Sequence, residues 1–137
     1  MTDKSLDDFL DSWKDNETRI KEAYIRFRDF ASKLSGVCLH FKARPGVTYS
    51  LRAKHENQKE RELFVMIDII DSDPDARWIS MCFYGDLVTD PEEKGDLIPG
   101  GLMGADGYCF DLDEWEESDL AYLETRLKEA AENSEQQ

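Results

Sequence analysis

Four polar residues are of types that could bind a small molecule together: His40, Ser50, Arg52 and Asp68. Asp68 interrupts the apolar run 63–70, and a carboxylate placed there needs hydrogen bonds or a basic partner. We expect that partner to be Arg52, Arg77 or His40. A buried carboxylate beside an arginine or histidine can belong to an active site, but more commonly it forms a structural pair or marks the end of a strand. The residues therefore suggest a ligand site without specifying one.

The two histidines do not form a catalytic or metal-binding pattern. His40 lies in a segment of alternating apolar residues, whereas His55 begins the polar stretch 55–61 and should be solvated. Neither has a second histidine or a carboxylate pair at ligand spacing, and the sequence contains no Gly-x-Ser-x-Gly or His-Glu-x-x-His signature. We predict no catalytic residue, no metal and no cofactor, although distant residues could still assemble a triad.

Asp71, Asp73 and Asp75 alternate in the way that a calcium loop begins. However, Ala76 stands where such a loop needs glycine, and Cys82 stands where it needs a bidentate glutamate. The segment is therefore predicted to be an exposed turn.

The segment 85–106 is rich in glycine and acidic residues and is longer than most connections in a compact domain. Within it lies an apolar stretch that should pack on the sheet or on another subunit, with the speculative interface residues Leu97, Ile98, Leu102 and Met103. A ligand lid is the third interpretation of this segment.

The net charge of −14 is unevenly distributed. Residues 1–68 hold 12 acids and 13 bases, whereas residues 69–137 hold 19 acids and 4 bases. So negative a surface repels phosphate backbones and anionic lipids, which argues against nucleic-acid and membrane partners. No apolar run approaches the roughly 18 residues of a membrane helix. An acidic protein of this kind is most simply a soluble one, and a basic protein partner is a further hypothesis.

The three cysteines, Cys38, Cys82 and Cys109, are an odd number with wide spacing. We expect small, buried, reduced thiols rather than a disulfide framework or a zinc site. The N-terminal segment 1–14 has no basic start or apolar centre of a secretion signal. Both observations favour the cytoplasm.

Hydrophobic periodicity predicts helices at both ends and strands between them. Apolar residues three or four apart within 6–34 predict one bent helix or a helix pair that ends at Gly36. The period then changes to two. The predicted strands are 37–42, 47–54, 63–70 (apolar on both faces and so covered on both), 77–87 and, as a fifth candidate, 107–112. The chain ends with an amphipathic helix that either Asp113 with Glu116, or Ser118 alone, can cap.

These elements predict an α+β fold. Short connections between successive strands require antiparallel pairing, so we expect a β-meander of four to five strands packed against the N-terminal and C-terminal helices. The chain should be a single domain over 1–137, with frayed ends at 1–3 and 133–137.

Three stretches resemble those of a family of small uncharacterised bacterial proteins: 44–52 (RPGVTYSLR), 63–68 (LFVMID) and 95–101 (GDLIPGG). The resemblance covers about the central half of the chain. It implies no activity and no site residue.

We expect a non-enzymatic binding or assembly module that forms a homodimer, because the chain combines an exposed sheet face and an apolar patch with no catalytic signature. One alternative is a small-molecule binder or modest enzyme that uses the polar sheet face under the 85–106 loop. A second is an acidic adaptor for a basic protein.

Overall fold

The computed structural model describes residues 4–136 and contains three helices and six strands in that range. In chain order they are α1 (Lys4–Ser12), α2 (Ile20–Ser32), β1 (Val37–Arg44), β2 (Thr48–His55), β3 (Val65–Ile70), β4 (Trp78–Tyr84), β5 (Asp96–Leu102), β6 (Ala105–Leu112) and α3 (Glu117–Ser134). The predicted α+β class is confirmed, with six strands rather than four to five. The N-terminal periodic run is a helix pair. We expected fraying over 133–137, but α3 continues to Ser134, whose side chain is buried.

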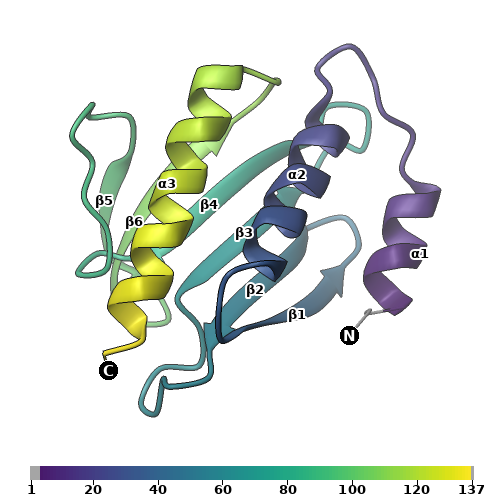
Figure 1. The fold of residues 1–137 in the computed structure, drawn as a ribbon. Helices are drawn as coiled ribbons and strands as arrows, with labels where there is room; N and C mark the ends of the chain where they lie inside the picture. The colour runs from purple at the N-terminus through teal and green to yellow at the C-terminus, as the bar shows by residue number, and fades with distance from the viewer. Residues whose placement is uncertain (1–3, 137) are drawn as a thin grey trace.

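The strands form one antiparallel sheet in the order β1-β2-β3-β4-β6-β5 (Figure 1). The first four strands follow chain order as a meander. After β4 the chain crosses to the far edge, so β6 pairs with β4 and β5 pairs with β6. The sheet is therefore a meander extended by a hairpin.

The hairpin explains why β5 was not predicted. Its sequence contains Pro99 and Gly100, which disfavour a central strand but are tolerated in an edge strand. Met103 and Gly104 have φ of 50° and 85°, the left-handed pair that a two-residue type I′ turn requires. The second half of the presumed 85–106 loop is thus a strand, a tight turn and the start of another strand.

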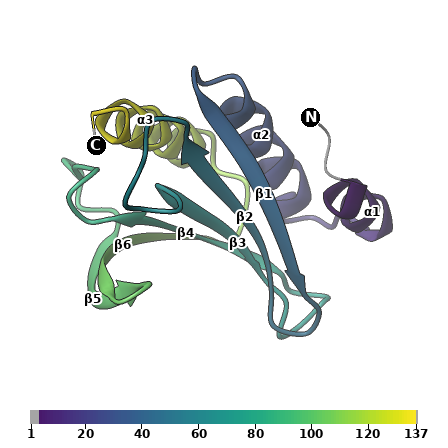
Figure 2. The same cartoon turned by 90° about the horizontal axis from the view of Figure 1, so that it is seen from below.

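The helices lie on one side of the sheet: α2 and α3 cross the strands side by side, and α1 lies near β1 (Figures 1 and 2). In β3 the residues facing the helices are fully buried and those facing away are only partly buried: Val65, Ile67 and Ile69 against Met66, Asp68 and Ile70. The prediction that this strand is covered on both faces is therefore wrong for the single chain. The side chains away from the helices form what we call the uncovered face, made of the even-numbered residues of β1–β4, Asp96 and Ile98 of β5, and the odd-numbered residues of β6.

A buried ion pair ties α1 to the ends of the first four strands. The Asp71 carboxylate accepts hydrogen bonds from Arg77 Nε at 2.7 Å and from the Gly46 backbone N–H at 2.8 Å. The Arg77 guanidinium also lies 5.3 Å from the ring of Phe9 in α1, 5.2 Å from the ring of Trp13 just after α1, and 5.6 Å from the Tyr49 ring. Only 4% of Asp71 is exposed, so this end of the predicted exposed turn belongs to the core.

Candidate binding surface

The strand register brings all four predicted ligand-binding residues onto the uncovered face. His40 is paired with Arg52 across β1 and β2, and Ser50 is paired with Asp68 across β2 and β3. In an antiparallel pair, directly opposite residues project to the same side. The structure thus confirms that these four side chains lie on the same face of the sheet. Their role in ligand binding stays a prediction.

Three of the four residues lie side by side. Arg52 Nε donates to Ser50 Oγ at 3.2 Å, and Ser50 lies directly opposite Asp68. Burial raises the pKa of Asp68, and the Ser50 hydrogen bond and the charges of Arg52 and Arg44 partly oppose this rise. Asp68 Oδ1 is buried and has no hydrogen-bond partner among the described residues. Of the three predicted partners, Arg52 acts on Asp68 through its charge, while Arg77 pairs with Asp71 on the other side of the sheet.

Apolar side chains lie on the uncovered face at two levels of the middle strands β3 and β4, with the polar pair Asp68 and Ser80 between them. Ile70 lies opposite Trp78 across β3 and β4, and Met66 lies opposite Cys82. All four side chains are only partly buried in the single chain. Antiparallel sheets that face water usually carry polar residues on the solvent side. The charged residues of β1 and β2 follow that pattern, whereas Met66, Ile70 and Trp78 of β3 and β4 depart from it.

The prediction of buried, reduced thiols is wrong for Cys82 and Cys109, and for Cys38 only the reduced state is confirmed. Cys82 and Cys109 occupy directly opposite positions on β4 and β6, with Cα atoms 4.1 Å apart, and form a disulfide; Cys38 is a free, exposed thiol on β1. The two bonded cysteines are 27 residues apart, and only the placement of β6 beside β4 brings them together. Structural disulfides are typical of oxidising compartments. Cysteine usage therefore no longer supports a cytoplasmic location.

Charge is segregated across the uncovered face. Its β1–β2 side carries four cations that form no salt bridge within 4 Å in the described chain: Lys42, Arg44, Arg52 and Lys54. Its β6–β5 side carries Asp96 and Asp111, which likewise lack a cation there. Burial and the neighbouring Asp96 charge raise the pKa of Asp111. The charge asymmetry between the two halves of the sequence is thus carried onto the two sides of one surface.

Three of the four predicted interface residues are exposed and the fourth is buried. Leu97, Ile98 and Met103 are 53%, 42% and 58% exposed, whereas Leu102 is 2% exposed and belongs to the core. Leu102 cannot contact a partner directly while the hairpin keeps this conformation. Ile98 projects to the uncovered face, and the Tyr84 hydroxyl of that face lies 3.9 Å from Met103 Sδ.

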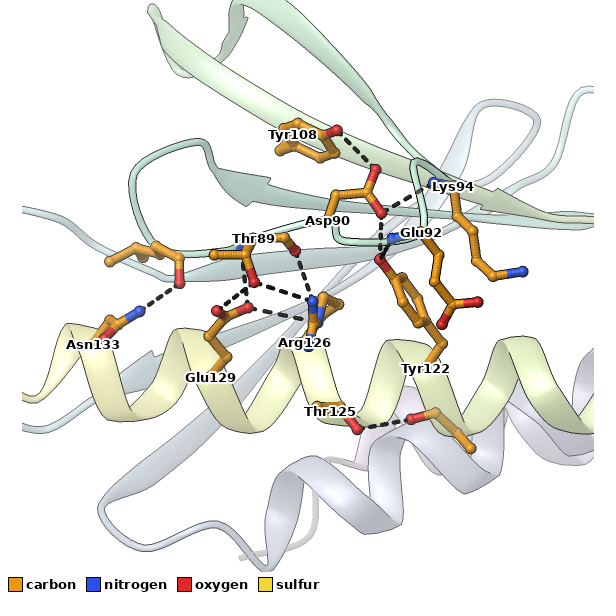
Figure 3. Close-up of polar contacts among 12 residues, drawn as sticks. Thr89, Asp90, Glu92, Lys94, Tyr108, Tyr122, Thr125, Arg126, Glu129 and Asn133 are labelled. Carbon is orange, nitrogen blue, oxygen red and sulfur yellow. Dashed lines mark hydrogen bonds and ion pairs between the residues drawn. The ribbon is translucent and has the colours of Figure 1, made fainter.

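Asp90 anchors the remaining loop, 85–95, on the helix side of the sheet (Figure 3). Its carboxylate accepts hydrogen bonds from the hydroxyls of Tyr122 and Tyr108, the latter at 2.7 Å, and from the backbone N–H groups of Lys94 and Gly95. Burial acts to raise the pKa of Asp90, but these hydrogen bonds outweigh it and lower the pKa to about 2.

A second set of contacts joins the same loop to α3 (Figure 3). Thr89 donates its backbone N–H and its hydroxyl to Glu129 at 2.9 and 2.8 Å, and Arg126 donates to the Thr89 carbonyl at 2.9 Å. Asn133 Nδ2 donates to the Leu87 carbonyl at 2.8 Å. The loop closes the helix side, and so it does not cover His40, Ser50, Arg52 or Asp68, which lie on the opposite face.

Replacing Asp90 by asparagine should destabilise the fold by about 1–2 kcal/mol at pH 7. The folded pKa of Asp90 lies below its unfolded value, so the carboxylate stabilises the fold above about pH 4 and loses this effect as the pH falls towards 2. Urea unfolding of both proteins should therefore give free energies that converge in acid. The exposed neighbour Glu92 offers a matched control, Glu92→Gln, for which we expect no such difference. A constant gap between native protein and Asp90→Asn down to pH 2 would contradict this account.

His55 also differs from its predicted environment. It is 3% exposed, its Nδ1 accepts the Asn57 backbone N–H at 3.1 Å, and its backbone N–H donates to Gln58 Oε1. Its ring lies so close to Gly36 that a Cβ at that position would approach Nε2 to 2.6 Å. Gly36 is therefore needed both for its φ of 75° and for this contact.

Four cavities in the described part of the chain are lined by residues other than these four polar ones. A groove of about 470 Å³ between α2 and α3 includes Ile25, Phe30 and Trp115, and cavities of about 410, 280 and 160 Å³ are lined by other residues again. Within residues 4–136 no group of three His, Cys, Asp or Glu side chains converges to hold a metal ion. No helix in that range is long and apolar enough to span a membrane.

Comparison with protein-family models, curated proteins and solved structures finds no match to this chain. The conclusions about function therefore depend on the geometry alone.

Proposed function

We propose that this protein is a non-catalytic assembly module that pairs with a second copy of itself through the uncovered face. The observation that carries the proposal is a six-stranded sheet with helices on one side and partly exposed Met66, Ile70 and Trp78 on the two middle strands of the other. Burying apolar surface of this kind stabilises association by about 25 cal/mol per Å².

The sequence of β3 supports the same proposal. Its residues are apolar on both faces except at Asp68, as in strands that lie between two layers. In the single chain only one layer, that of the helices, is present. A second sheet packed about 10 Å below would supply the other.

The small-molecule alternative has less support. The four polar residues lie on an open sheet surface, the described cavities are lined by other residues, and the 85–95 loop lies on the opposite side. The acidic-adaptor alternative is weakened because several acids are already paired within the chain: Glu117 and Glu124 with Arg26, and Asp119 with Lys94.

Sedimentation equilibrium of the full chain tests the proposal. Six strands about 4.8 Å apart give a face of roughly 25 by 20 Å, at the small end of specific interfaces, so the range should extend from about 1 µM to several hundred micromolar. We expect the average mass to rise towards twice that of the monomer. A monomer throughout this range would overturn the proposal.

A further inference from the structure

We infer that the two copies stack face to face about a two-fold axis parallel to the strands, so that the β1–β2 side of each uncovered face lies over the β6–β5 side of the other. This inference rests on the proposed self-association and specifies its geometry. The observation behind it is the segregation of unpaired charge on one surface.

The cations of the β1–β2 side are gathered on one surface. Of the 17 bases, seven form salt bridges within residues 4–136 and ten do not, and four of those ten lie together on this side of the uncovered face. These four are Lys42, Arg44, Arg52 and Lys54, although the charges of Arg44 and Arg52 also act on Asp68 of the same face. Within residues 4–136 Asp96 and Asp111 on that face have no cation within 4 Å. Each group thus lacks a direct salt bridge within the chain and carries the charge that the other group could pair with.

Symmetry decides how two such faces can meet. A two-fold axis in the plane between the sheets and parallel to the strands reverses the strand order, so β1 lies over β5, β2 over β6 and β3 over β4 of the second copy. An axis across the strands instead places β1 over β1 and each charge over its like. Like charges placed opposite each other at an interface are unfavourable, so the first arrangement is selected.

The register then identifies the facing residues. His40, Arg52, Met66, Cys82, Cys109 and Asp96 lie in one row across the sheet. Rotation about the proposed axis reverses the strand order but leaves the position of each row along the strands unchanged. His40 of one copy therefore faces Asp96 of the second copy. Lys42 belongs to the next row of the sheet, which also contains Asp111. In the dimer, Lys42 lies over β5 of the second copy, one strand outside the Asp111 of that copy. Its long side chain can therefore reach both Asp96 and Asp111 of the second copy.

The apolar residues of β3 and β4 fit the same arrangement. Ile70 and Trp78 occupy one row on β3 and β4, so each Ile70 faces Trp78 of the second copy, twice per dimer. In Figure 2 the β5 end of the sheet curls away from the helices, towards the side where the second copy would lie. This curl brings Asp96 and Ile98 closer to the partner's β1.

Charge reversal tests the geometry. In Lys42→Glu, two glutamates per dimer would face Asp96 and Asp111, and in Asp111→Lys, two lysines would face the cations of β1. Both side chains are exposed. We expect each variant to dimerise about 10-fold more weakly by sedimentation equilibrium, because exposed charges contribute modestly per pair and each change occurs twice.

The decisive sample is a one-to-one mixture of these two variants. In the mixed dimer, the introduced glutamate and the introduced lysine would face each other at one contact. Native Lys42 would face native Asp111 at the other contact, so association should return to within about 3-fold of native. Lys128→Glu, an exposed reversal on α3, is the matched control and should leave dimerisation unchanged. Thermal melts monitored by circular dichroism verify that every variant is folded.

The outcomes separate the two proposals. Weakened single variants with a restored mixture support the inference. A native dimer that is unaffected by either reversal, or a mixture no stronger than its components, overturns the geometry and leaves self-association standing. A native chain that stays monomeric overturns the proposed function itself.

Discussion

Replacing Ile70 by glutamate is expected to weaken self-association more than 100-fold. Ile70 ends β3, one of the two middle strands of the proposed contact, and faces Trp78 of the second copy. The change would place two uncompensated carboxylates per dimer in an apolar interface, and an unpaired buried charge costs several kcal/mol. At 1.4 kcal/mol for each factor of ten, about 3 kcal/mol exceeds a 100-fold change.

The same substitution should leave the monomer folded. Ile70 is only partly buried in the single chain and its neighbours across the strands, Thr48 and Trp78, are uncharged. We expect the free energy of unfolding to change by about 1 kcal/mol or less. Ile25→Glu is the matched control, because Ile25 is also partly buried but lies on the outer side of α2. If Ile70→Glu dimerised as the native chain does, the uncovered face would not be the interface.

Replacing Asp71 by alanine should lower the free energy of unfolding by about 3 kcal/mol. The change leaves the Arg77 guanidinium beside the Trp13 and Tyr49 rings without its anion, and leaves the Gly46 N–H without its acceptor. Breaking one side of a buried pair costs more than the pair contributes, because the remaining charge stays desolvated.

Urea unfolding at a concentration where the chain is monomeric measures this loss without a contribution from association. Asp75→Ala, in the same turn but exposed, should change the stability by less than about 0.5 kcal/mol. A loss below about 1 kcal/mol for Asp71→Ala would show that the Asp71–Arg77 pair is not a principal tie between α1 and the sheet.

The features of the fold that could be predicted from the sequence are those encoded locally. Spacings of three and four before Gly36, and alternation after it, predicted the helices and the first four strands. The same alternation predicted that Arg52 and Asp68 share a face. The β2–β3 register confirms this, because it pairs Ser50 with Asp68 and Arg52 is two residues from Ser50.

The features that were missed depend on contacts distant in sequence. Strand β5 is stabilised by pairing with β6 and has weak strand propensity of its own. The Cys82–Cys109 bond and the buried position of Leu102 follow from the same hairpin. Asp71 was predicted to be an exposed turn residue because its partner Arg77 and the rings of α1 meet only in the folded chain. The single signal available for β5 was the apolar stretch 97–103, which predicted packing without indicating a strand.

The most direct test of the face-to-face account is a spin–spin distance in the dimer. Cys38 is the one free thiol, it is exposed, and it lies on the outer strand of the uncovered face. A nitroxide attached there needs no mutation. Because β1 lies over β5 of the second copy, five strand spacings of about 4.8 Å and a sheet separation of about 10 Å predict a Cα separation of roughly 25 Å. Pairing through the β5 edges would instead give roughly 50 Å, and that distance, or no dipolar coupling at all, would contradict the account.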